Sequence, residues 1–288
     1  MIVVTGANGF IGSWMVEKLN SQGFYNLVVV DDFHRKPNHN YLTALRYSES
    51  IDLHNLESWL IGNQEEVEFI IHLGAITDTT ETDLSLLKEY NTDYSKMIWN
   101  ICSKSQIPLI YASSAATYGA GEHGFSDDHS IIPKLNPLNA YAWSKHNFDL
   151  WALEQSSQPY YWAGLKFFNV YGPEREEHKG NMASMFYQIE KQIKEVGTVK
   201  LFKSNHPDYA HGEQRRDFIH VSEVVEKISN LMLGRINNGI FNLGTGKSRS
   251  FNEMVKEVSI QLNLKTTIEY IDLPKELSHN YQYFTEAQ

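Results

Sequence analysis

The sequence has a single cysteine, Cys102, and no long apolar run among its 288 residues. One cysteine excludes a disulfide within the chain and a cysteine-based zinc site. No stretch approaches the ~20 consecutive apolar residues that a membrane-spanning helix requires. The chain starts directly with an apolar run rather than with a cationic leader and cleavage site, so we expect a cytoplasmic protein.

Basic residues are also scarce, because 25 lysines and arginines stand against 35 aspartates and glutamates, a formal net charge of −10. Binding to nucleic acids or anionic membranes requires a basic surface, so neither kind of partner is expected. A few local cations could still bind an anionic small molecule. The length is sufficient for one large domain or two unequal lobes with buried cores.

Short apolar runs alternate with segments of helical period along the first part of the chain. The predicted buried strands are residues 2–5, 27–31, 69–73, 109–113 and 163–168, and the predicted helices are residues 10–22, 84–105 and 137–155. This alternation predicts an α/β fold with a Rossmann-type doubly wound parallel sheet and right-handed crossovers.

Charged and polar segments interrupt the pattern after Pro173. Helices are predicted over residues 181–195, 224–233 and 250–262, the last one opened by the capping-box pattern S-F-N-E, and strands over residues 218–221 and 240–243. We expect a dinucleotide-binding domain over residues 1–168, to which a strand and helix near 217–238 return. Residues 169–216 and 239–288 are expected to form a smaller α/β substrate-binding lobe.

Three glycines follow the first predicted strand at a regular spacing. Gly6, Gly9 and Gly12 give the pattern G-x-x-G-x-x-G between a strand and a helix. Glycines allow the backbone to turn tightly and to approach a pyrophosphate, whose charge then lies at the helix N-terminus. The spacing and its context predict a dinucleotide site.

The residues after the second predicted strand bear on the choice of dinucleotide. Asp31 and Asp32 lie about 20 positions after the glycines, where an acidic residue binds the ribose hydroxyls of NAD. Arg35 and Lys36 follow, and they could neutralise the 2′-phosphate of NADP. From these residues alone, the choice between NADP and NAD stays open.

A second group of residues is typical of proton transfer beside a nicotinamide. Tyr141 and Lys145 lie four apart, so they share one face of the predicted helix. An ammonium about 5 Å from a phenolate supplies roughly 3 kcal/mol at an effective dielectric of about 20, which favours ionised Tyr141. Ser114, at the end of a strand, can donate a hydrogen bond to a substrate oxygen that becomes a carbonyl.

Taken together, these motifs resemble the extended short-chain dehydrogenase/reductase superfamily, which acts on nucleotide sugars. Further stretches are similar to signatures of the ADP-L-glycero-D-manno-heptose 6-epimerase family. They are Y-A-S-S-A-A-T-Y-G at 111–119, F-N-V-Y-G-P at 168–173, H-K-G-N-M-A-S at 178–184, R-D-F at 216–218, F-N-L-G-T-G at 241–246 and Y-Q-x-F-T at 281–285. The stretch at 178–184 best distinguishes this family from the rest of the superfamily. The similarity covers almost the whole chain.

The resemblance implies an NADP-dependent isomerase that inverts a sugar carbon in lipopolysaccharide core biosynthesis, and a homo-oligomer. It implies that Tyr141 is one catalytic base, supported by Ser114 and Lys145, and that Lys179 is the second acid/base. Inversion through a transient ketone requires proton exchange on each face, and a partly desolvated lysine can serve.

The resemblance also implies residues that contact the two ligands. The cofactor-binding residues would be Gly6, Gly9, Phe10, Ile11, Gly12, Asp31, Asp32, Lys36, Leu73, Gly74, Ala75, Asn91, Tyr141, Lys145 and Lys179. The residues of the ADP-sugar site would be Ser114, Asn169, Val170, Asn181, Gln188, Phe202, Ser204, Arg216 and Tyr281. Arg216 would pair with the diphosphate.

Some positions depart from the family pattern. Asp32 stands where asparagine is usual, Gln188 where histidine is usual, and residues 204–214 form a longer segment. The histidines of that segment lack helical spacing and an acidic partner, so no metal site is expected. Two alternatives remain: another nucleotide-sugar epimerase, reductase or dehydratase, and a cofactor-binding sensor without catalysis. Ala115-Ala116-Thr117 replaces the Asp-Glu pair typical of dehydratases, which disfavours that reaction.

Overall fold

The computed structural model describes residues 1–34, 40–172, 174–274 and 281–288, and its contacts group the chain into two compact units. Unit 1 comprises Met1–Ser114, Ala140–Lys166 and Val221–Phe241. Unit 2 comprises Ala115–Asn139, Phe167–His220 and Asn242–Gln288. Each unit is described by itself. The expected division at residue 168 into a cofactor domain and a substrate lobe stays a prediction about function.

Unit 1 is built on a seven-stranded sheet with the order β10-β6-β5-β4-β1-β2-β3. The strands are β1 (Ile2–Thr5), β2 (Leu27–Asp31), β3 (Glu49–Asp52), β4 (Phe69–His72), β5 (Leu109–Ser114), β6 (Trp162–Phe167) and β10 (Gly239–Leu243). β1 pairs in parallel with both β2 and β4, and β4 pairs in parallel with β5. The expected Rossmann-type parallel sheet is confirmed.

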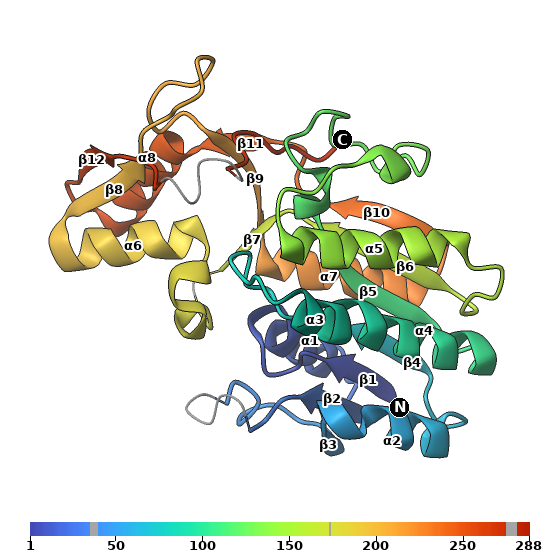
Figure 1. Cartoon of the computed structure of the whole chain (residues 1–288). Helices are drawn as coiled ribbons and strands as arrows, with labels where there is room; N and C mark the ends of the chain where they lie inside the picture. Colours follow the sequence, from blue (N-terminus) through green and yellow to red (C-terminus); the bar gives the residue numbers. More distant parts are fainter. Residues whose placement is uncertain (35–39, 173, 275–280) are drawn as a thin grey trace. The chain divides into compact units, whose positions relative to one another are not determined.

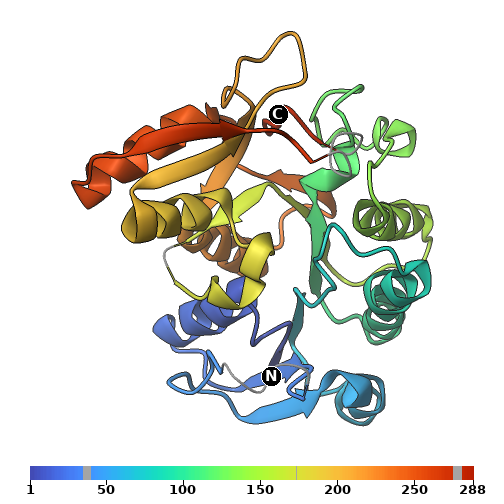
Figure 2. The same ribbon diagram turned by 60° about the vertical axis from the view of Figure 1, so that its left-hand side comes forward.

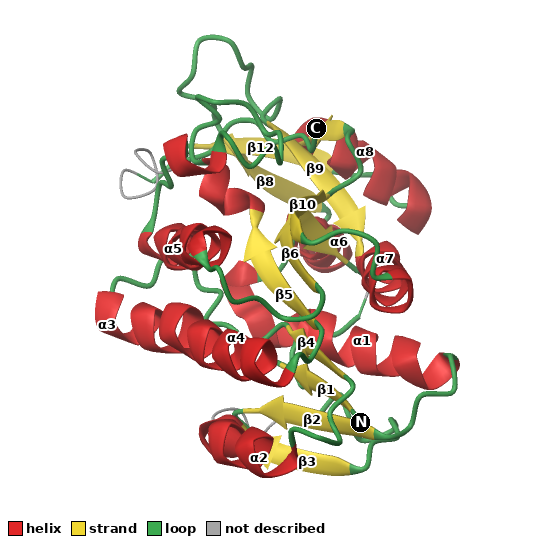
Figure 3. Ribbon diagram, turned by 90° about the vertical axis from the view of Figure 1, so that its right-hand side faces the viewer, coloured by secondary structure: helices red, strands yellow, loops and turns green. Residues whose placement is uncertain are grey.

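Helices cover both faces of this sheet. They are α1 (Phe10–Ser21), α2 (Leu56–Asn63), α3 (Leu84–Leu87), α4 (Tyr94–Ser105), α5 (Ala140–Glu154) and α7 (Val221–Gly234), with a 3₁₀ turn η1 at Leu53–Asn55. Figure 3 shows α1 and α7 on one side of the sheet and α4 and α5 on the other. The central strands are buried on both faces, which explains their continuous apolar runs.

The helix expected over residues 84–105 is divided in the structure. A π-helical segment η2 (Lys88–Asp93) separates α3 from α4, and it contains the buried Asn91 and Thr92. The side chain of Thr92 donates to the Ser144 carbonyl oxygen of α5 at 2.9 Å. The π-helical segment therefore directs polar side chains at α5, and such segments are frequent at functional sites.

Unit 2 contains two small sheets. One has the order β11-β9-β7, from β7 (Asn169–Tyr171), β9 (Arg215–His220) and β11 (Ser248–Ser250), and β7 is parallel to β9. The other pairs β8 (Thr198–Phe202) in parallel with β12 (Thr267–Ile271), the neighbouring gold and red strands of Figure 2. The remaining elements are α6 (Met185–Val196), α8 (Phe251–Leu262) and the 3₁₀ turns η3 (Ala115–Tyr118), η4 (Ile132–Lys134) and η5 (Glu177–Met182) (Figure 1).

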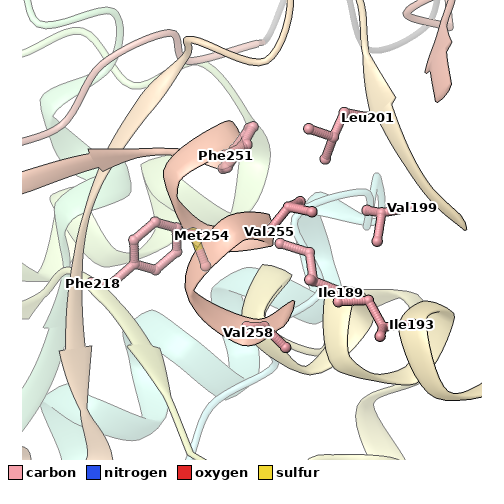
Figure 4. Close-up of a cluster of buried hydrophobic side chains, with 9 residues drawn as sticks. All are labelled: Ile189, Ile193, Val199, Leu201, Phe218, Phe251, Met254, Val255 and Val258. Atoms are coloured by element: carbon pink, nitrogen blue, oxygen red, sulfur yellow. The ribbon is translucent and has the colours of Figure 1, made fainter. Parts of the chain in front are cut away.

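The core of unit 2 lies between α6, α8 and β8. Figure 4 shows Ile189 and Ile193 of α6 facing Val255 and Val258 of α8, with residues of β8 alongside. The predicted capping box is confirmed, because the Ser250 hydroxyl and the Glu253 side chain bond each other's backbone N–H. The predicted helix at 181–195 begins later, at Met185, where the Ser184 side chain caps it.

No helix in the described part of the chain is long and apolar enough to cross a membrane.

Candidate functional site

At two of its three glycines, the turn between β1 and α1 leaves no room for a side chain, because the protein's own backbone lies too close. Gly6 has a φ of +66°, and a Cβ there would lie 2.7 Å from the backbone of Gly74. A Cβ on Gly12 would lie 2.0 Å from the Gly6 carbonyl oxygen. The α1 helix therefore starts against the turn itself, as the dinucleotide motif requires.

The N-terminus of α1 is suited to an anion. Its cap residue, Gly9, provides no side-chain hydrogen bond, and no acidic residue lies in the first turn. A Cβ on Gly9 would meet only the Gly6 carbonyl oxygen, at 3.1 Å. The first backbone N–H groups and the helix dipole can then face a pyrophosphate. Phe10 is buried and Ile11 half-buried at this end of the helix.

Asp31 closes the second strand beside the same turn. Its carboxylate accepts hydrogen bonds from the backbone N–H of Asn8 and of Asp32, both at 2.8 Å. Asn8 in turn accepts from the N–H of Tyr41 at 3.0 Å. These bonds hold Asp31 at the position where the motif places a ribose-binding carboxylate. Lys36, the predicted partner of a 2′-phosphate, lies outside the described residues.

A buried histidine that sequence reasoning missed supports this turn. The Thr5 hydroxyl lies 2.6 Å from His72 Nδ1 and accepts from the N–H of Gly74 at 3.1 Å, and His72 Nε2 lies 3.0 Å from the Ser95 hydroxyl. Burial, and then the charge of Lys145, lower the pKa of His72 to about 3, so the imidazole is neutral. It fixes the start of the predicted cofactor-contact segment Leu73, Gly74 and Ala75.

Asn91, a predicted cofactor contact, is fully buried and bonded to the protein. Its amide donates to the Ile76 carbonyl oxygen and to the Ser144 hydroxyl, both at 2.9 Å, and its carbonyl accepts from the Ile76 N–H at 2.8 Å. The Ser144 hydroxyl donates to the Tyr141 carbonyl oxygen at 2.7 Å. Asn91 thus joins the segment after β4 to the helix that carries Tyr141.

The structure brings Tyr141, Lys145 and Ser114 together within unit 1. Tyr141 and Lys145 lie one turn apart on α5 and are buried, and Ser114 ends β5 and hydrogen-bonds the Tyr141 side chain. The Lys145 ammonium donates to the Ala112 carbonyl oxygen at 2.9 Å. The predicted proton-transfer group is therefore assembled on α5 and β5, although its catalytic role stays a prediction.

The electrostatics of this group differ from the sequence expectation. Burial raises the pKa of Tyr141, the hydrogen bond from Ser114 opposes this, and the charge of Asp149 adds to it. Burial lowers the pKa of Lys145 to about 8, against the opposing effect of Asp149. Lys145 therefore keeps its charge at neutral pH, but the chain alone does not make Tyr141 more acidic. A cationic nicotinamide against the phenol is needed for that.

In unit 2, Lys179 lies in η5 with its side chain 23% exposed, 3.5 Å from a carboxylate oxygen of Glu176. Burial lowers the pKa of Lys179, and Glu176 opposes this. Glu176, which sequence reasoning missed, is fully buried and accepts from the N–H groups of Gly172 and Ser184, at 3.1 and 2.6 Å. The sequence does not distinguish Glu176 from its neighbour Glu177, because only these contacts within the loop separate the two.

Arg216 is a buried cation of unit 2. Its guanidinium centre lies 5.6 Å from the Tyr281 ring and 5.7 Å from the Phe251 ring, and it donates to the Arg215 carbonyl oxygen at 2.9 Å. Among the described residues no carboxylate forms an ion pair with it. A planar cation held between aromatic rings in this way suits a phosphate.

The other predicted substrate residues of unit 2 have the following positions. Asn169 donates to the Asp217 carbonyl oxygen at 3.2 Å, and Val170 lies beside Ile219 in the sheet. Gln188 donates to the Gly180 carbonyl oxygen at 2.7 Å, and the Phe202 and Tyr281 rings are 6.4 Å apart. The Ser204 hydroxyl donates to the His206 carbonyl oxygen at 3.1 Å. The side chain of Asn181 lies outside the structural description.

The parallel sheet and the glycine turn define a Rossmann-type dinucleotide-binding protein. The model of the NAD dependent epimerase/dehydratase family matches residues 2–244. The chain belongs to this family, which assigns it a nicotinamide cofactor.

Individual relatives are similar over the full length. The ADP-L-glycero-D-manno-heptose-6-epimerase of Fusobacterium nucleatum is 45% identical over 298 aligned residues, which cover 100% of this chain and 90% of the relative. The solved ADP-L-glycero-D-manno-heptose-6-epimerase of Helicobacter pylori is 27% identical, with a TM-score of 0.78, and the match covers 99% of this chain and 91% of that one. MoeE5 in complex with UDP-glucose and NAD is 25% identical, with a TM-score of 0.78, over 99% and 88% of the two chains.

Proposed function

We propose that the chain is an isomerase that epimerises C6″ of ADP-D-glycero-D-manno-heptose, giving ADP-L-glycero-D-manno-heptose through a transient ketone. The observation that carries this proposal is the 45% identity, over the whole chain, to a relative named for that reaction. The assembled Tyr141, Ser114 and Lys145 provide the proton-transfer group that such a reaction needs.

The chemistry divides between hydride and proton transfer. When bound, the oxidised nicotinamide would accept a hydride from C6″ and, once reduced, return it. Tyr141 takes the proton of the C6″ hydroxyl, and the Ser114 hydroxyl donates a hydrogen bond to the oxygen as it becomes a carbonyl. The ammonium of Lys145 favours the phenolate form of Tyr141.

Inversion requires that the ketone be reduced on its other face, and proton exchange there needs a second group. We assign that role to Lys179, because burial lowers its pKa and Glu176 holds it in a fixed loop. We also assign to Arg216 the binding of the diphosphate of the substrate. Substrate contacts for the remaining predicted residues, and a homo-oligomeric state, are part of the same proposal.

The direct test is incubation of the purified protein with ADP-D-glycero-D-manno-heptose, without added reductant, followed by NMR of the C6″ configuration. Interconversion of the two epimers supports the proposal. Stoichiometric consumption of added NADPH would instead identify a reductase, and an unchanged substrate would favour a cofactor-binding sensor.

For the cofactor we propose NADP, with NAD as the alternative. The end of β2 is compatible with either, since the Asp31 carboxylate is positioned by two backbone N–H groups and Arg35 and Lys36, which follow it in the sequence, could neutralise a 2′-phosphate. Mass spectrometry of the nucleotide released from the purified protein tests this. NADP is expected, and NAD alone would contradict the assignment.

A further inference from the structure

A buried ion pair lies behind the proton-transfer group and takes no part in the chemistry proposed above. Asp149 Oδ2 lies 2.7 Å from the ammonium of Lys166, and both side chains are completely buried. Asp149 is on α5, four residues after Lys145 and eight after Tyr141, so the three share one face of the helix. Lys166 comes from β6.

The same carboxylate also binds two hydroxyls of β5. Oδ1 accepts from the Tyr111 hydroxyl at 3.1 Å, and Oδ2 accepts from the Ser113 hydroxyl at 2.6 Å. Ser113 directly precedes Ser114, and Ala112 directly precedes Ser113 and accepts from Lys145. Asp149 therefore joins α5, β5 and β6 at the point where β5 presents Ser114 to Tyr141.

The packing around this carboxylate is closely fitted. Gly164 of β6 faces the Tyr111 ring, and a Cβ there would lie 2.3 Å from Tyr111 Cζ. A carboxylate buried at such a site is costly unless it is paired and hydrogen-bonded, and Asp149 is both. This arrangement leaves little freedom for β5 to shift relative to α5 near Ser114.

The charge of Asp149 also acts on its neighbours. It opposes the effect of burial on the pKa of Lys145, and it raises the pKa of Tyr141. The other ionisable groups facing this region are His146 on α5, Tyr111 on β5, Lys166 on β6 and His72 on β4. His146 and His72 both have lowered pKa values and are neutral at pH 7, so they do not replace the charge of Asp149.

We propose that Asp149, balanced by Lys166, is a positioning residue of this site: through Ser113 it fixes β5 so that Ser114 meets Tyr141, and it holds a negative charge on the helix face that carries Lys145. Asp149 touches neither substrate nor cofactor in this account. The kinetic part of the test rests on the proposed epimerisation, and the unfolding part does not.

The main test is the double variant Asp149→Asn/Lys166→Met, which removes both charges together and leaves no unpaired buried ion. Asp149 shares the helix face of Lys145 and Tyr141, so the loss of its charge should outweigh the opposite effect of losing Lys166. The pKa values of Lys145 and Tyr141 should then both fall, and both limbs of the kcat/KM pH profile should move to lower pH, by about 1. A purely structural effect lowers the maximum and leaves both limbs in place, and that result would overturn the proposal.

A second measurement needs no substrate. The pKa of Lys145 falls from its ordinary 10.5 in the unfolded chain to about 8 in the folded protein, so the unfolded chain binds more protons between these values. The free energy of unfolding from urea titrations gains a contribution from this group that rises with pH above about 8. In the double variant that rise should begin at lower pH, and an unchanged onset would contradict the proposal. If the wild-type protein epimerises nothing and the onset still moves, only the proposed function fails.

Ser113→Ala serves as the matched control, because it removes one hydrogen bond to Asp149 and keeps both charges. We expect kcat to fall about 10-fold with KM and the pH profile unchanged, since Ser114 loses its fixed position. If the double variant does not fold, this variant still tests the positioning role of Asp149. A wild-type kcat in both Ser113→Ala and Tyr111→Phe would then overturn the positioning role.

Discussion

At the scale of single residues, the candidate site is governed by how burial acts on opposite charges. Burial raises the pKa of Tyr141 and lowers the pKa of Lys145, because it disfavours the ionised form of each. Lys145 still carries its charge at neutral pH, whereas Tyr141 needs the added positive charge of a nicotinamide to act as a base. The spacing of the two residues was visible in the sequence, but their burial was not.

The first residue-scale prediction concerns the two assigned acid/base groups. Tyr141→Phe and Lys179→Met should each reduce kcat by about 10²–10⁴-fold, the usual contribution of a positioned acid or base. Both variants should remain folded, as urea titration would show. Wild-type turnover in Lys179→Met would show that the second acid/base is assigned wrongly.

The second residue-scale prediction concerns Glu176, which lies beside Lys179. Glu176→Gln removes the charge that raises the pKa of Lys179, so this pKa, followed by NMR titration of the labelled lysine side chain, should fall by about 1. Ser184→Ala is the matched control, since it removes a 2.7 Å hydrogen bond to Glu176 and retains the charge. The same shift in both variants would mean that loop geometry, and not charge, is responsible.

At the scale of elements, the buried strands and amphipathic helices could be predicted because their own residues carry the pattern. β1 and β4 are continuous apolar runs, and the capping box at Ser250 is local. The edge strand β3 was missed, because Glu49 and Ser50 are exposed and only Ile51 is buried. The π-helical segment η2 was missed as well, because it depends on hydrogen bonds from Asn91 to Ile76 and α5, which are remote in sequence.

The element-scale prediction concerns the π-helical segment η2. Asn91→Ala leaves the Ile76 backbone groups and the Ser144 hydroxyl without their buried partner, so the free energy of unfolding should fall by about 1–3 kcal/mol. Asn100→Ala, an exposed position on α4, is the control and should change stability by less than about 0.5 kcal/mol. Urea titration compares them, and equal stabilities would contradict a joining role for Asn91.

At the scale of the whole molecule, sequence reasoning predicted the family, because the motifs that carry it are local patterns. The glycine turn and the Tyr141–Lys145 pair are local patterns and lie in unit 1. Residues 115–139 group with unit 2, through contacts such as the Tyr118 hydroxyl with Asn242 at 2.7 Å. Such long-range contacts leave no local pattern in the sequence. The same holds for the buried Asp217 carboxylate, which accepts hydrogen bonds from the N–H groups of Thr245, Gly246 and Ala287.

In the proposed reaction C6″ is inverted by transient oxidation, so the hydrogen on that carbon never exchanges with solvent. The most direct test is the conversion of ADP-D-glycero-D-manno-heptose in D₂O, followed by NMR at C6″. We expect the L-glycero epimer to form with protium retained at C6″. Deuterium at C6″ of the product would contradict it, because inversion would then proceed by removal of a proton from carbon.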